Sequence, residues 1–500
     1  MSTDQNQNLS TEETFEQRNQ RIEKLNELKE AEINPFGGPV EDIQSTSEVL
    51  KQFEQCAEEE TVEVKVAGRL TAQREMGKSI FADVKDSSGR LQVYAKKNVL
   101  GEELFEWFKK LDLGDIIAVE GSLFKTRKGE DTLKIESFEL LSKALRPLPE
   151  KWHGLSDVER RYRQRYLDLV TSDETRERFK TRSRIIKEIR DILNDRDFME
   201  VETPMLQPQA GGAAAKPFET YYSALDCPMY MRIAPELYLK RLLVGGFEKI
   251  FELNRNFRNE GLSRHHNPEF TMIEIYQAYS DCRGMMNLAE YLITTLARSV
   301  FGKDELTLGD GSQVSLERPW KRVPYDDLIK TYAGEDWFDL SEEERRQRAK
   351  QMELEVTSEM TDVEVTNEVY EKVVEDKLIQ PTFVTRIPAD LVPLAKTCDD
   401  DPTKADVFEL EIGGEEIAPG YSELNDPLKQ RQKFEEQLKR DGVADEENKN
   451  QLDEDFLTAL EHGMPPAGGM GIGIDRLLML LTGASSIRDV ILFPHLRPRS

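Results

Sequence analysis

The chain has 500 residues, of which 38% are hydrophobic and 33% are charged, and its formal net charge at pH 7 is -28. This length predicts about two to four domains, and the composition excludes collagen-like, repetitive and wholly disordered proteins. The excess of acid argues against a protein whose entire surface attracts nucleic acid, although it allows a local basic site.

The sequence has no apolar run near the roughly 18 residues that a membrane-spanning helix requires. Its first residues, MSTDQNQNLSTEE, lack the basic start and the apolar core of a signal peptide. The cysteines are widely separated and form no CxxC pair, so the sequence predicts neither a disulfide framework nor a zinc site. We therefore expect a cytoplasmic protein that has no membrane partner.

The N-terminal part combines a helix with a run of short strands. Ser10 and Glu13 form a potential capping box, which would begin a polar helix that ends near Ala31. From Val62 a period of two appears, and strands are predicted near residues 62–67, 79–84, 91–95, 116–123 and 133–140. Five short strands with glycine-containing turns predict a small barrel, for which the oligonucleotide-binding fold is the natural candidate.

Within this predicted barrel, residues 65–97 carry eight lysines and arginines against three acidic residues. An aromatic ring, an amide and two cations are the groups that stack on and hold nucleic-acid bases, and they are offered by Phe81, Gln92, Arg69 and Arg74. The same residues also fit a barrel with Phe81 in its core and solvated cations. Composition alone leaves both interpretations open.

The second half of the chain contains several structural patterns. An amphipathic helix is predicted around residues 185–193, followed by a strand over residues 198–203 that stops at Pro204. Residues 330–380 are highly charged and helix-patterned, and we expect a helical insertion without catalytic groups. Residues 441–461 predict a solvated acidic face.

The densest group of reactive side chains lies in residues 249–279, which predict two strands joined by a polar loop over residues 261–268. Arg258 and Glu260 are two apart and would share one strand face. The same spacing on the returning strand groups Phe270, Met272, Glu274 and Tyr276. If the two faces coincide, a cation, two carboxylates, a phenol and a ring line one surface, which is costly to bury without a ligand.

A nucleotide suits this surface. Arg258 would bind phosphate, Phe270 would stack on a base, and Glu260 would accept from an exocyclic amine. The alternative is a salt-bridged sheet face with Phe270 in the core.

A second group of acidic residues lies around Gly413 and Gly414, which predict a two-residue hairpin turn. In that register Glu411 lies opposite Glu416, and Glu409 lies diagonally from Glu416 on the same face. Adjacent carboxylates repel, so the hairpin either binds a divalent cation or is simply an exposed acidic hairpin.

Glu423 would point to the opposite face from Glu416 if the strand alternated strictly. A shared site therefore requires a bulge, for which Pro419 and Gly420 are the candidates.

The third pattern is GGMGIGIDR over residues 468–476. A dinucleotide-binding fingerprint would require glycine where Ile474 stands, so that interpretation fails. Glycines at 469, 471 and 473 would instead flatten one strand face against a ligand, and Arg476 would begin the next helix near a phosphate. A glycine-rich strand packed by a helix is the structural alternative.

Taken together, these segments resemble the three signature motifs of class II aminoacyl-tRNA synthetases, and in detail the lysyl-tRNA synthetases of the bacterial and eukaryotic type. The motifs appear in family order from about residue 60 to the C-terminus: WHGLSDVERRYRQRYLDL, FMEVETPML, RIAPELYLKRLL, FRNEG with HNPEFT, QPTFV, YSELNDP and GMGIGIDRLLMLLTG.

The resemblance implies an α+β protein, in which an N-terminal five-stranded OB-fold barrel precedes an antiparallel sheet flanked by helices. We expect an N-terminal helix and linker in residues 1–60, an anticodon-binding barrel in 61–148, a linker in 149–175 and a catalytic domain in 176–500 that contains the insertion. A homodimer through the helix and strand that end at Pro204 is also implied.

Carried onto matching positions, the resemblance implies roles for the nucleotide site. Arg258 would bridge the lysine carboxylate and the ATP α-phosphate, and with Arg476 it would be catalytic. ATP would be bound by Arg258, Glu260, His266, Phe270 and Arg476, with Phe270 and Arg476 on either side of the adenine. Mg²⁺ would be held by Glu409 and Glu416.

The resemblance also implies sites for the other two substrates. Gly212 and Glu236 would hold the α-amino group of lysine, whose other contacts would be Arg258, Glu274, Tyr276, Tyr421 and Glu423. A carboxylate at the blind end suits a terminal ammonium, because a desolvated unpaired charge is strongly disfavoured. The anticodon of tRNA(Lys) would be bound by Arg74, Phe81 and Gln92.

Two positions depart from the family pattern, which commonly has asparagine at Pro419 and often phenylalanine at Tyr421. Proline has no side-chain amide, so one expected contact to lysine is missing or replaced.

The implied activity is an ATP-dependent lysine–tRNA ligase with L-lysine, ATP and tRNA(Lys) as substrates. The alternative from another class is a catalytically inactive synthetase-like regulator that binds RNA. A paralogue that lysylates a protein would lack the barrel, and an aspartyl or asparaginyl enzyme would require a cation where Glu423 stands.

Overall fold

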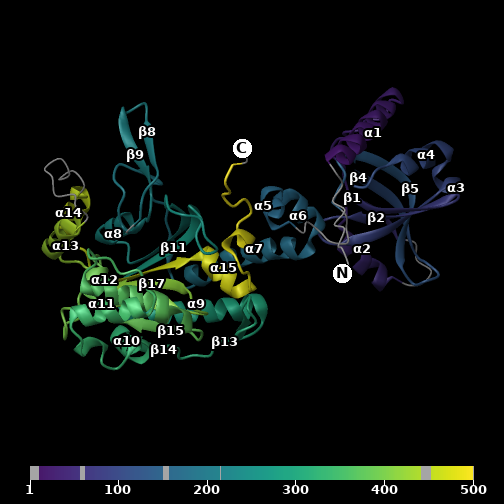
Figure 1. Cartoon of the computed structure of the whole chain (residues 1–500). Coiled ribbons are helices and arrows are strands. Elements are labelled where there is room, and N and C mark those ends of the chain that lie inside the picture. Colours follow the sequence, from purple (N-terminus) through teal and green to yellow (C-terminus); the bar gives the residue numbers. More distant parts are fainter. Residues whose placement is uncertain (1–10, 57–61, 150–156, 214, 441–451, 499–500) are drawn as a thin grey trace. The chain divides into compact units, whose positions relative to one another are not determined.

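The computed structural model describes residues 11–56, 62–149, 157–213, 215–440 and 452–498. The chain divides into two compact units, Met1–Ser156 and Asp157–Ser500, which are described separately here (Figure 1). No helix within the described ranges is both long and apolar enough to cross a lipid bilayer.

The first unit is built on five strands, β1 (Glu63–Met76), β2 (Ser79–Lys85), β3 (Arg90–Lys96), β4 (Ile116–Lys125) and β5 (Asp131–Ser142). They form a closed barrel in the order β1-β2-β3-β5-β4, with β3 and β5 parallel and the other pairs antiparallel. Alternate apolar residues such as Val64, Val66, Leu91 and Val93 are buried in its core. The predicted five-stranded barrel is therefore confirmed.

Four helices accompany the barrel: α1 (Thr11–Glu30), α2 (Thr46–Gln55), α3 (Lys97–Leu100) and α4 (Glu102–Lys110). The predicted N-terminal helix is α1, although Ser10 of its predicted capping box lies outside the described residues. Arg21 of α1 donates to the carbonyl oxygens of Leu113, Ala144 and Arg146 at 3.2, 3.1 and 3.0 Å. Because these carbonyls lie beside the barrel strands, Arg21 fastens α1 to this unit.

The second unit contains an eight-stranded sheet in the order β14-β15-β16-β17-β18-β11-β10-β6. Its strands are β6 (Met199–Glu200), β10 (Lys249–Phe257), β11 (Glu269–Ala278), β14 (Lys321–Pro324), β15 (Thr382–Thr385), β16 (Val407–Glu411), β17 (Glu416–Ser422) and β18 (Ala467–Gly473). All neighbours are antiparallel except the two outer pairs, β14 with β15 and β10 with β6. The expected antiparallel sheet is thus confirmed.

Apolar helix faces cover this sheet. Ile185 and Ile189 of α7 (Asp173–Asn194) share a core with α9 (Cys282–Leu296) and α15 (Ile474–Thr482). The strand predicted over residues 198–203 is shorter, since β6 covers only Met199–Glu200. The N–H of Val201 still donates to Phe251 O at 2.9 Å, and the Thr203 hydroxyl donates to Glu252 Oε2 at 2.6 Å.

Smaller elements complete this unit. They are the strands β7 (Leu206–Gln207), β8 (Glu219–Tyr222), β9 (Cys227–Met231), β12 (Glu305–Thr307) and β13 (Gln313–Ser315), and the helices α8 (Glu236–Val244), α13 (Pro427–Arg440), α14 (Glu454–Glu461) and α16 (Ile487–Val490). Most of the predicted acidic face at residues 441–461 lies outside the described residues.

The expected helical insertion is the connection between two parallel strands. Helices α10 (Tyr325–Ala333), α11 (Glu342–Gln351) and α12 (Asp362–Val369) follow β14 and precede β15, and they lie together beside these strands (Figure 1). They enclose a separate core that includes Trp337 and Tyr370.

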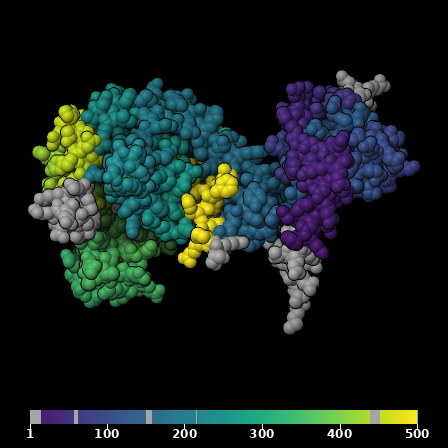
Figure 2. Space-filling model, turned by 90° about the horizontal axis from the view of Figure 1, so that it is seen from above, coloured from purple at the N-terminus to yellow at the C-terminus, as the bar shows by residue number. Residues whose placement is uncertain are grey.

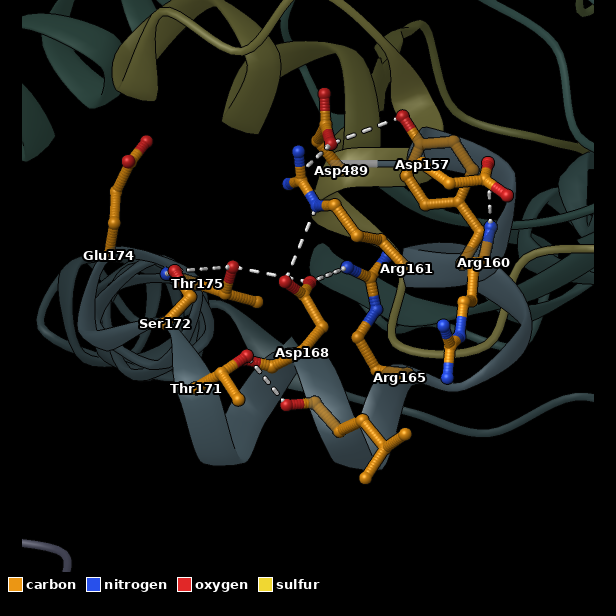
Figure 3. Close-up of polar contacts among 12 residues, drawn as sticks. Asp157, Arg160, Arg161, Arg165, Asp168, Thr171, Ser172, Glu174, Thr175 and Asp489 are labelled. Carbon is orange, nitrogen blue, oxygen red and sulfur yellow. Dashed lines mark hydrogen bonds and ion pairs between the residues drawn. The ribbon is translucent and has the colours of Figure 1, made fainter. Parts of the chain in front are cut away.

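Two short helices, α5 (Val158–Arg163) and α6 (Arg165–Thr171), are fastened to the C-terminal segment. The buried Arg165 donates to the carbonyl oxygens of Leu492 and Arg488 at 2.9 and 2.7 Å. Figure 3 shows Arg161 and Arg165 converging on Asp168, at 3.3 and 2.8 Å. The C-terminal segment, yellow in the space-filling view, lies on the surface of this unit (Figure 2).

Candidate active site

One face of the sheet carries the predicted row Phe270, Met272, Glu274 and Tyr276 on β11, since β10 and β11 pair without a bulge. Arg258 and Glu260, in contrast, do not lie on the strand as predicted, because β10 ends at Phe257. The N–H of Arg258 donates to Pro268 O at 2.8 Å and keeps the start of the loop beside β11. The Arg258 guanidinium therefore lies 5.2 Å from the centre of the Phe270 ring.

The proposed nucleotide residues line one pocket of ≈ 140 Å³, which we call the nucleotide pocket. Its lining includes Arg258, Glu260, His266, Phe270, Glu416, Pro419 and Arg476. Nε of Arg258 is buried and has no hydrogen-bond partner among the described residues. A cationic group with an unpaired donor nitrogen in a pocket, beside a half-buried aromatic ring, fits an anionic, aromatic ligand such as a nucleotide.

Two contacts hold Arg476 across this pocket. Its Nη1 donates to Glu416 O at 3.0 Å, and its Nη2 lies 3.1 Å from His266 Nε2. Partial desolvation of the ring, together with the nearby Arg476, lowers the pKa of His266, although the residue as a whole is exposed. The imidazole is therefore mostly neutral at pH 7, and its Nε2 accepts a hydrogen bond from Arg476 Nη2.

Asp475 joins the two sides of the nucleotide pocket. One carboxylate oxygen accepts from the N–H of Thr271 at 2.7 Å, and the other contacts Arg182 of α7 at 2.5 Å. Thr271 is the residue after Phe270, and Asp475 is the residue before Arg476. The Asp475 carboxylate therefore fixes the distance between Phe270 and Arg476, which lie on opposite sides of the pocket. Sequence reasoning missed Asp475 and Arg182, whose positions 293 residues apart gave no local signal.

The acidic hairpin turns at Gly413 and Gly414, whose φ angles of 71° and 74° confirm the predicted two-residue turn. Glu411 pairs with Glu416 as predicted. The register then shifts so that Ile417 is the extra residue. The bulge therefore lies at Ile417, and its prediction at Pro419 and Gly420 was wrong.

This bulge places Glu416 and Glu423 on the same sheet face, because it changes the alternation between them. Pro419 is tolerated in an interior strand because the pairing of β17 with β18 covers only residues 420–422. Pro419 has no backbone N–H, so it loses no hydrogen bond at a position where β17 and β18 do not pair. There the two strands separate, and Pro419 lines the nucleotide pocket.

Glu409 and Glu416 belong to a larger acidic group. Burial raises the pKa of Glu409 to about 8, with further contributions from Glu416, Glu375 and Glu371. Burial and Glu416 likewise raise the pKa of Glu375 to about 7. Glu371 and Glu375 of this group come from the insertion, for which no catalytic groups were expected; their spacing of four residues was the available signal.

The acidic group fits a divalent cation. Among the described residues, no three His, Cys, Asp or Glu side chains are arranged to hold a metal ion by themselves. Mg²⁺ is usually bound by one or two carboxylates together with substrate phosphates, and it would relieve the repulsion that raises the pKa of Glu409.

A second set of buried polar side chains comes from α8, β11 and the end of β17: Glu236, Lys240, Glu274, Tyr276 and Glu423. Because the sequence resemblance implies lysine contacts for four of these five residues, we call this set the lysine pocket. All five are at most 5% exposed. Tyr276 donates its hydroxyl to Glu274 Oε2 at 3.0 Å, and burial together with Glu236 raises the pKa of Glu274 to about 8. Glu274 is therefore mostly protonated at pH 7.

Gly212 and Tyr421 lie beside this pocket. Gly212 adopts a φ of 87°, and a Cβ there would lie 3.2 Å from Glu236 Cβ. Tyr421 pairs with Gly469 of β18, and Gly469 also pairs with Tyr276. The predicted lysine residues are thus brought together, except for Arg258, which lines the nucleotide pocket.

Lys240 was not predicted, although it stands four residues after Glu236 on α8. Its Nζ lies 2.7 Å from Glu236 Oε1 and 2.5 Å from Glu423 Oε2.

The glycines of β18 make room for side chains of the site. A Cβ at Gly469 would lie 2.1 Å from Glu423 Oε1 and 2.5 Å from the Tyr276 ring. A Cβ at Gly471 would lie 2.2 Å from the Met272 methyl group. In this structure the flat strand therefore accommodates the pocket walls, whereas the sequence analysis expected it to face the ligand directly.

In the barrel unit, Arg74, Phe81 and Gln92 lie on one face. Arg74 pairs with Phe81 across β1 and β2, and Phe81 pairs with Tyr94, two residues from Gln92 on β3. The Phe81 and Tyr94 ring centres are 4.7 Å apart, and Phe81 is only half-buried. Gln92 is buried and accepts from the Thr132 hydroxyl at 2.9 Å.

Two family models match the chain, one over the barrel and one over the unit that contains the eight-stranded sheet. Residues 64–141 match the OB-fold nucleic acid binding domain, and residues 157–497 match the class II tRNA synthetases (D, K and N). The fold and the pocket therefore define a class II tRNA synthetase.

Relatives narrow this class. The chain is 53% identical over 480 residues to the lysine–tRNA ligase of Carboxydothermus hydrogenoformans, covering 96% of this chain and 97% of the relative. It is 49% identical over 495 residues to the lysine–tRNA ligase of Bacillus cereus, covering 98% and 99%. The chain belongs to the lysine–tRNA ligase family.

Proposed function

We propose that the protein activates L-lysine with ATP to form lysyl-adenylate and then transfers the lysyl group to the terminal adenosine of tRNA(Lys). The observation that carries this proposal is the buried lysine pocket, in which Glu236 and Glu423 are 5% and 0% exposed. Glu236 would bind the α-amino group, and Glu423 would favour a long aliphatic side chain that ends in an ammonium group.

In the first step the lysine carboxylate attacks the ATP α-phosphorus and pyrophosphate leaves. The attacking group is already anionic, so the step needs in-line positioning and charge neutralisation more than a base. Arg258 would hold the carboxylate and the α-phosphate, while Phe270 and Arg476 would hold the adenine between them. Mg²⁺, held by Glu409 and Glu416, would neutralise charge on the phosphates when bound.

In the second step the terminal ribose hydroxyl of tRNA(Lys) accepts the lysyl group and AMP leaves. Arg74, Phe81 and Gln92 would bind the anticodon on the barrel face, where the half-buried Phe81 ring is available for stacking.

We also propose a homodimer through α7 and β6. This proposal is supported by the position of β6 at the edge of the sheet, with Met199 41% exposed. The cytoplasmic location expected from the sequence stays a prediction.

Amino-acid-dependent ATP–pyrophosphate exchange tests the proposal. Lysine should support exchange, and Arg258→Ala should lower it by about a thousandfold, because Arg258 would neutralise transition-state charge. Arg255→Ala is the matched control, since Arg255 lies on the same hairpin, is 40% exposed and pairs with Glu269 outside the pocket lining.

Exchange with aspartate in place of lysine would contradict the substrate assignment. If none of the twenty amino acids supported exchange, the result would favour the inactive RNA-binding alternative. That alternative gives the charged groups of the two pockets no role.

A further inference from the structure

Lys240 is the buried cation of the lysine pocket, and the two steps above do not use it. Its side chain is 0% exposed. Its Nζ contacts Glu236 Oε1 at 2.7 Å, Glu423 Oε2 at 2.5 Å and the carbonyl oxygen of Leu394 at 3.5 Å. One nitrogen of the chain therefore contacts both carboxylates proposed for the two amino groups of the substrate.

The fold holds this contact in place. Glu236 and Lys240 are four residues apart on α8 and share one helix face. Glu423 follows β17 directly, and its N–H donates to Ala467 O at 2.9 Å. Because Gly469 has no Cβ, Glu423 Oε1 can lie against the backbone of β18. The three side chains are thus positioned by a helix and two neighbouring strands.

We propose that Lys240 is a positioning residue that favours the ionised form of Glu423 before the substrate lysine binds. The inference rests on the proposed function, in which Glu423 binds the side-chain ammonium of lysine. Two carboxylates in a dry pocket repel each other, and without a nearby cation one of them takes up a proton. A protonated Glu423 no longer favours an ammonium over a methyl group.

Charge accounting agrees with this role. Glu236, Glu423 and Lys240 together carry a net charge of about -1 when ionised, which one side-chain ammonium neutralises. Without Lys240 the same two carboxylates would carry about -2, and uptake of a proton would be the simplest compensation.

The environment of Glu423 supports the same conclusion. Burial raises the pKa of Glu423 to about 7, and Lys240 is the largest influence that opposes this rise. Burial alone would lower the pKa of Lys240, but Glu236 and Glu423 outweigh it and raise this pKa. The charged and titratable groups that influence or face Glu423 are Lys240 and Glu236 on α8, Tyr276 on β11, Tyr421 on β17 and Lys396 before β16.

The test is the preference for lysine over norleucine, which has a methyl group in place of the terminal ammonium. The ratio of the two kcat/KM values is measured by ATP–pyrophosphate exchange between pH 6.5 and 9. Lys240→Met should lower this ratio by about tenfold or more at pH 7, the loss expected for a charge-assisted hydrogen bond. The ratio should recover as the pH rises, because a carboxyl group with a higher pKa ionises later.

Two further variants separate charge from packing. The double variant Lys240→Met/Glu236→Gln removes one charge of each sign, so Glu423 should ionise again and the ratio at pH 7 should rise toward the wild-type value. Any weakening of the α-amino contact cancels in the ratio, since both substrates have that group. Arg241→Met is the matched control, because Arg241 is the next residue on α8 and pairs with Asp453 at 2.7 Å.

Glu423→Gln distinguishes the inference from the function on which it rests. If Glu423→Gln lowers the ratio while Lys240→Met leaves both the ratio and its pH dependence unchanged, the inference is wrong and the proposed function stands. If Glu423→Gln leaves the ratio unchanged, the lysine assignment itself fails. Should Lys240→Met not fold, a double variant that folds without recovering the ratio would equally overturn the inference.

Discussion

The nucleotide pocket and the lysine pocket share one sheet face, but their charges are stabilised differently. In the nucleotide pocket the side chains of Arg476 and Glu416 are 25% and 37% exposed. In the lysine pocket those of Lys240 and Glu423 are both 0% exposed. Solvent therefore screens the first set of charges, whereas the chain itself must supply the counter-charge for the second. Among residues that only support a pocket, a substitution in the dry pocket should consequently have the larger effect.

Among substitutions of residues that support the site without contacting the reacting atoms, the largest expected effect comes from adding one methyl group to the lysine pocket. Gly469→Ala would place a Cβ 2.1 Å from Glu423 Oε1 and displace that carboxylate. We expect kcat/KM for lysine to fall by about 100-fold, because a misplacement of about 1 Å has this effect in active sites. Steady-state ATP–pyrophosphate exchange measures it. Gly38→Ala is the control, because the Cβ added there meets no atom within 4 Å and Gly38, like Gly469, does not have a positive φ.

A smaller effect is expected from the support of the nucleotide pocket. Asp475→Asn would leave the Arg182 guanidinium without its carboxylate and loosen the link to Thr271. We expect KM for ATP to rise by about tenfold, and the protein to lose about 3 kcal/mol of unfolding free energy, since a nearly buried ion pair is broken. Exchange kinetics and denaturant unfolding measure the two effects. An unchanged KM for ATP would show that Asp475 does not set the spacing of the pocket.

The comparison also predicts that His266 contributes less to ATP binding than Asp475 does. His266 is exposed, and its Nε2 lies 3.1 Å from Arg476 Nη2. His266→Ala should raise KM for ATP by about threefold, as expected for the loss of one solvent-accessible hydrogen bond. KM for lysine should stay the same, and a parallel rise in both constants would indicate that the loop supports both pockets.

A substitution in the barrel should affect neither pocket. Phe81→Ala should lower kcat/KM for tRNA charging by about tenfold through lost stacking, while exchange stays within about twofold of wild type. Aminoacylation assays with varied salt should also show binding that weakens as salt rises. Loss of exchange together with charging would instead indicate that Phe81 stabilises the fold.

The sequence was most informative where chemistry and position are local. The barrel strands, the turn at Gly413 and Gly414 and the row from Phe270 to Tyr276 all follow from periodicity or from turn residues. The two supports of the nucleotide pocket were missed because Arg182 and Asp475 meet only through the tertiary fold. Lys240 was missed for a different reason, since a helix position four residues after Glu236 does not reveal that Glu423 lies opposite.

The bulge shows the limit of such predictions. The need for a bulge followed from the alternation of Glu416 and Glu423, but its position did not. A proline and a glycine were the obvious candidates, yet the extra residue is Ile417, and Pro419 is accommodated where two strands part.

The contacts of Arg165 have a consequence for how the chain is made. Its partners Arg488 and Leu492 are synthesised more than 320 residues later, so α5 and α6 cannot reach their final packing until translation has passed them. The barrel has all of its strands before residue 143 and can fold while the ribosome is still extending the chain. If translation stopped early, the released chain would therefore contain a folded barrel followed by an incomplete second unit.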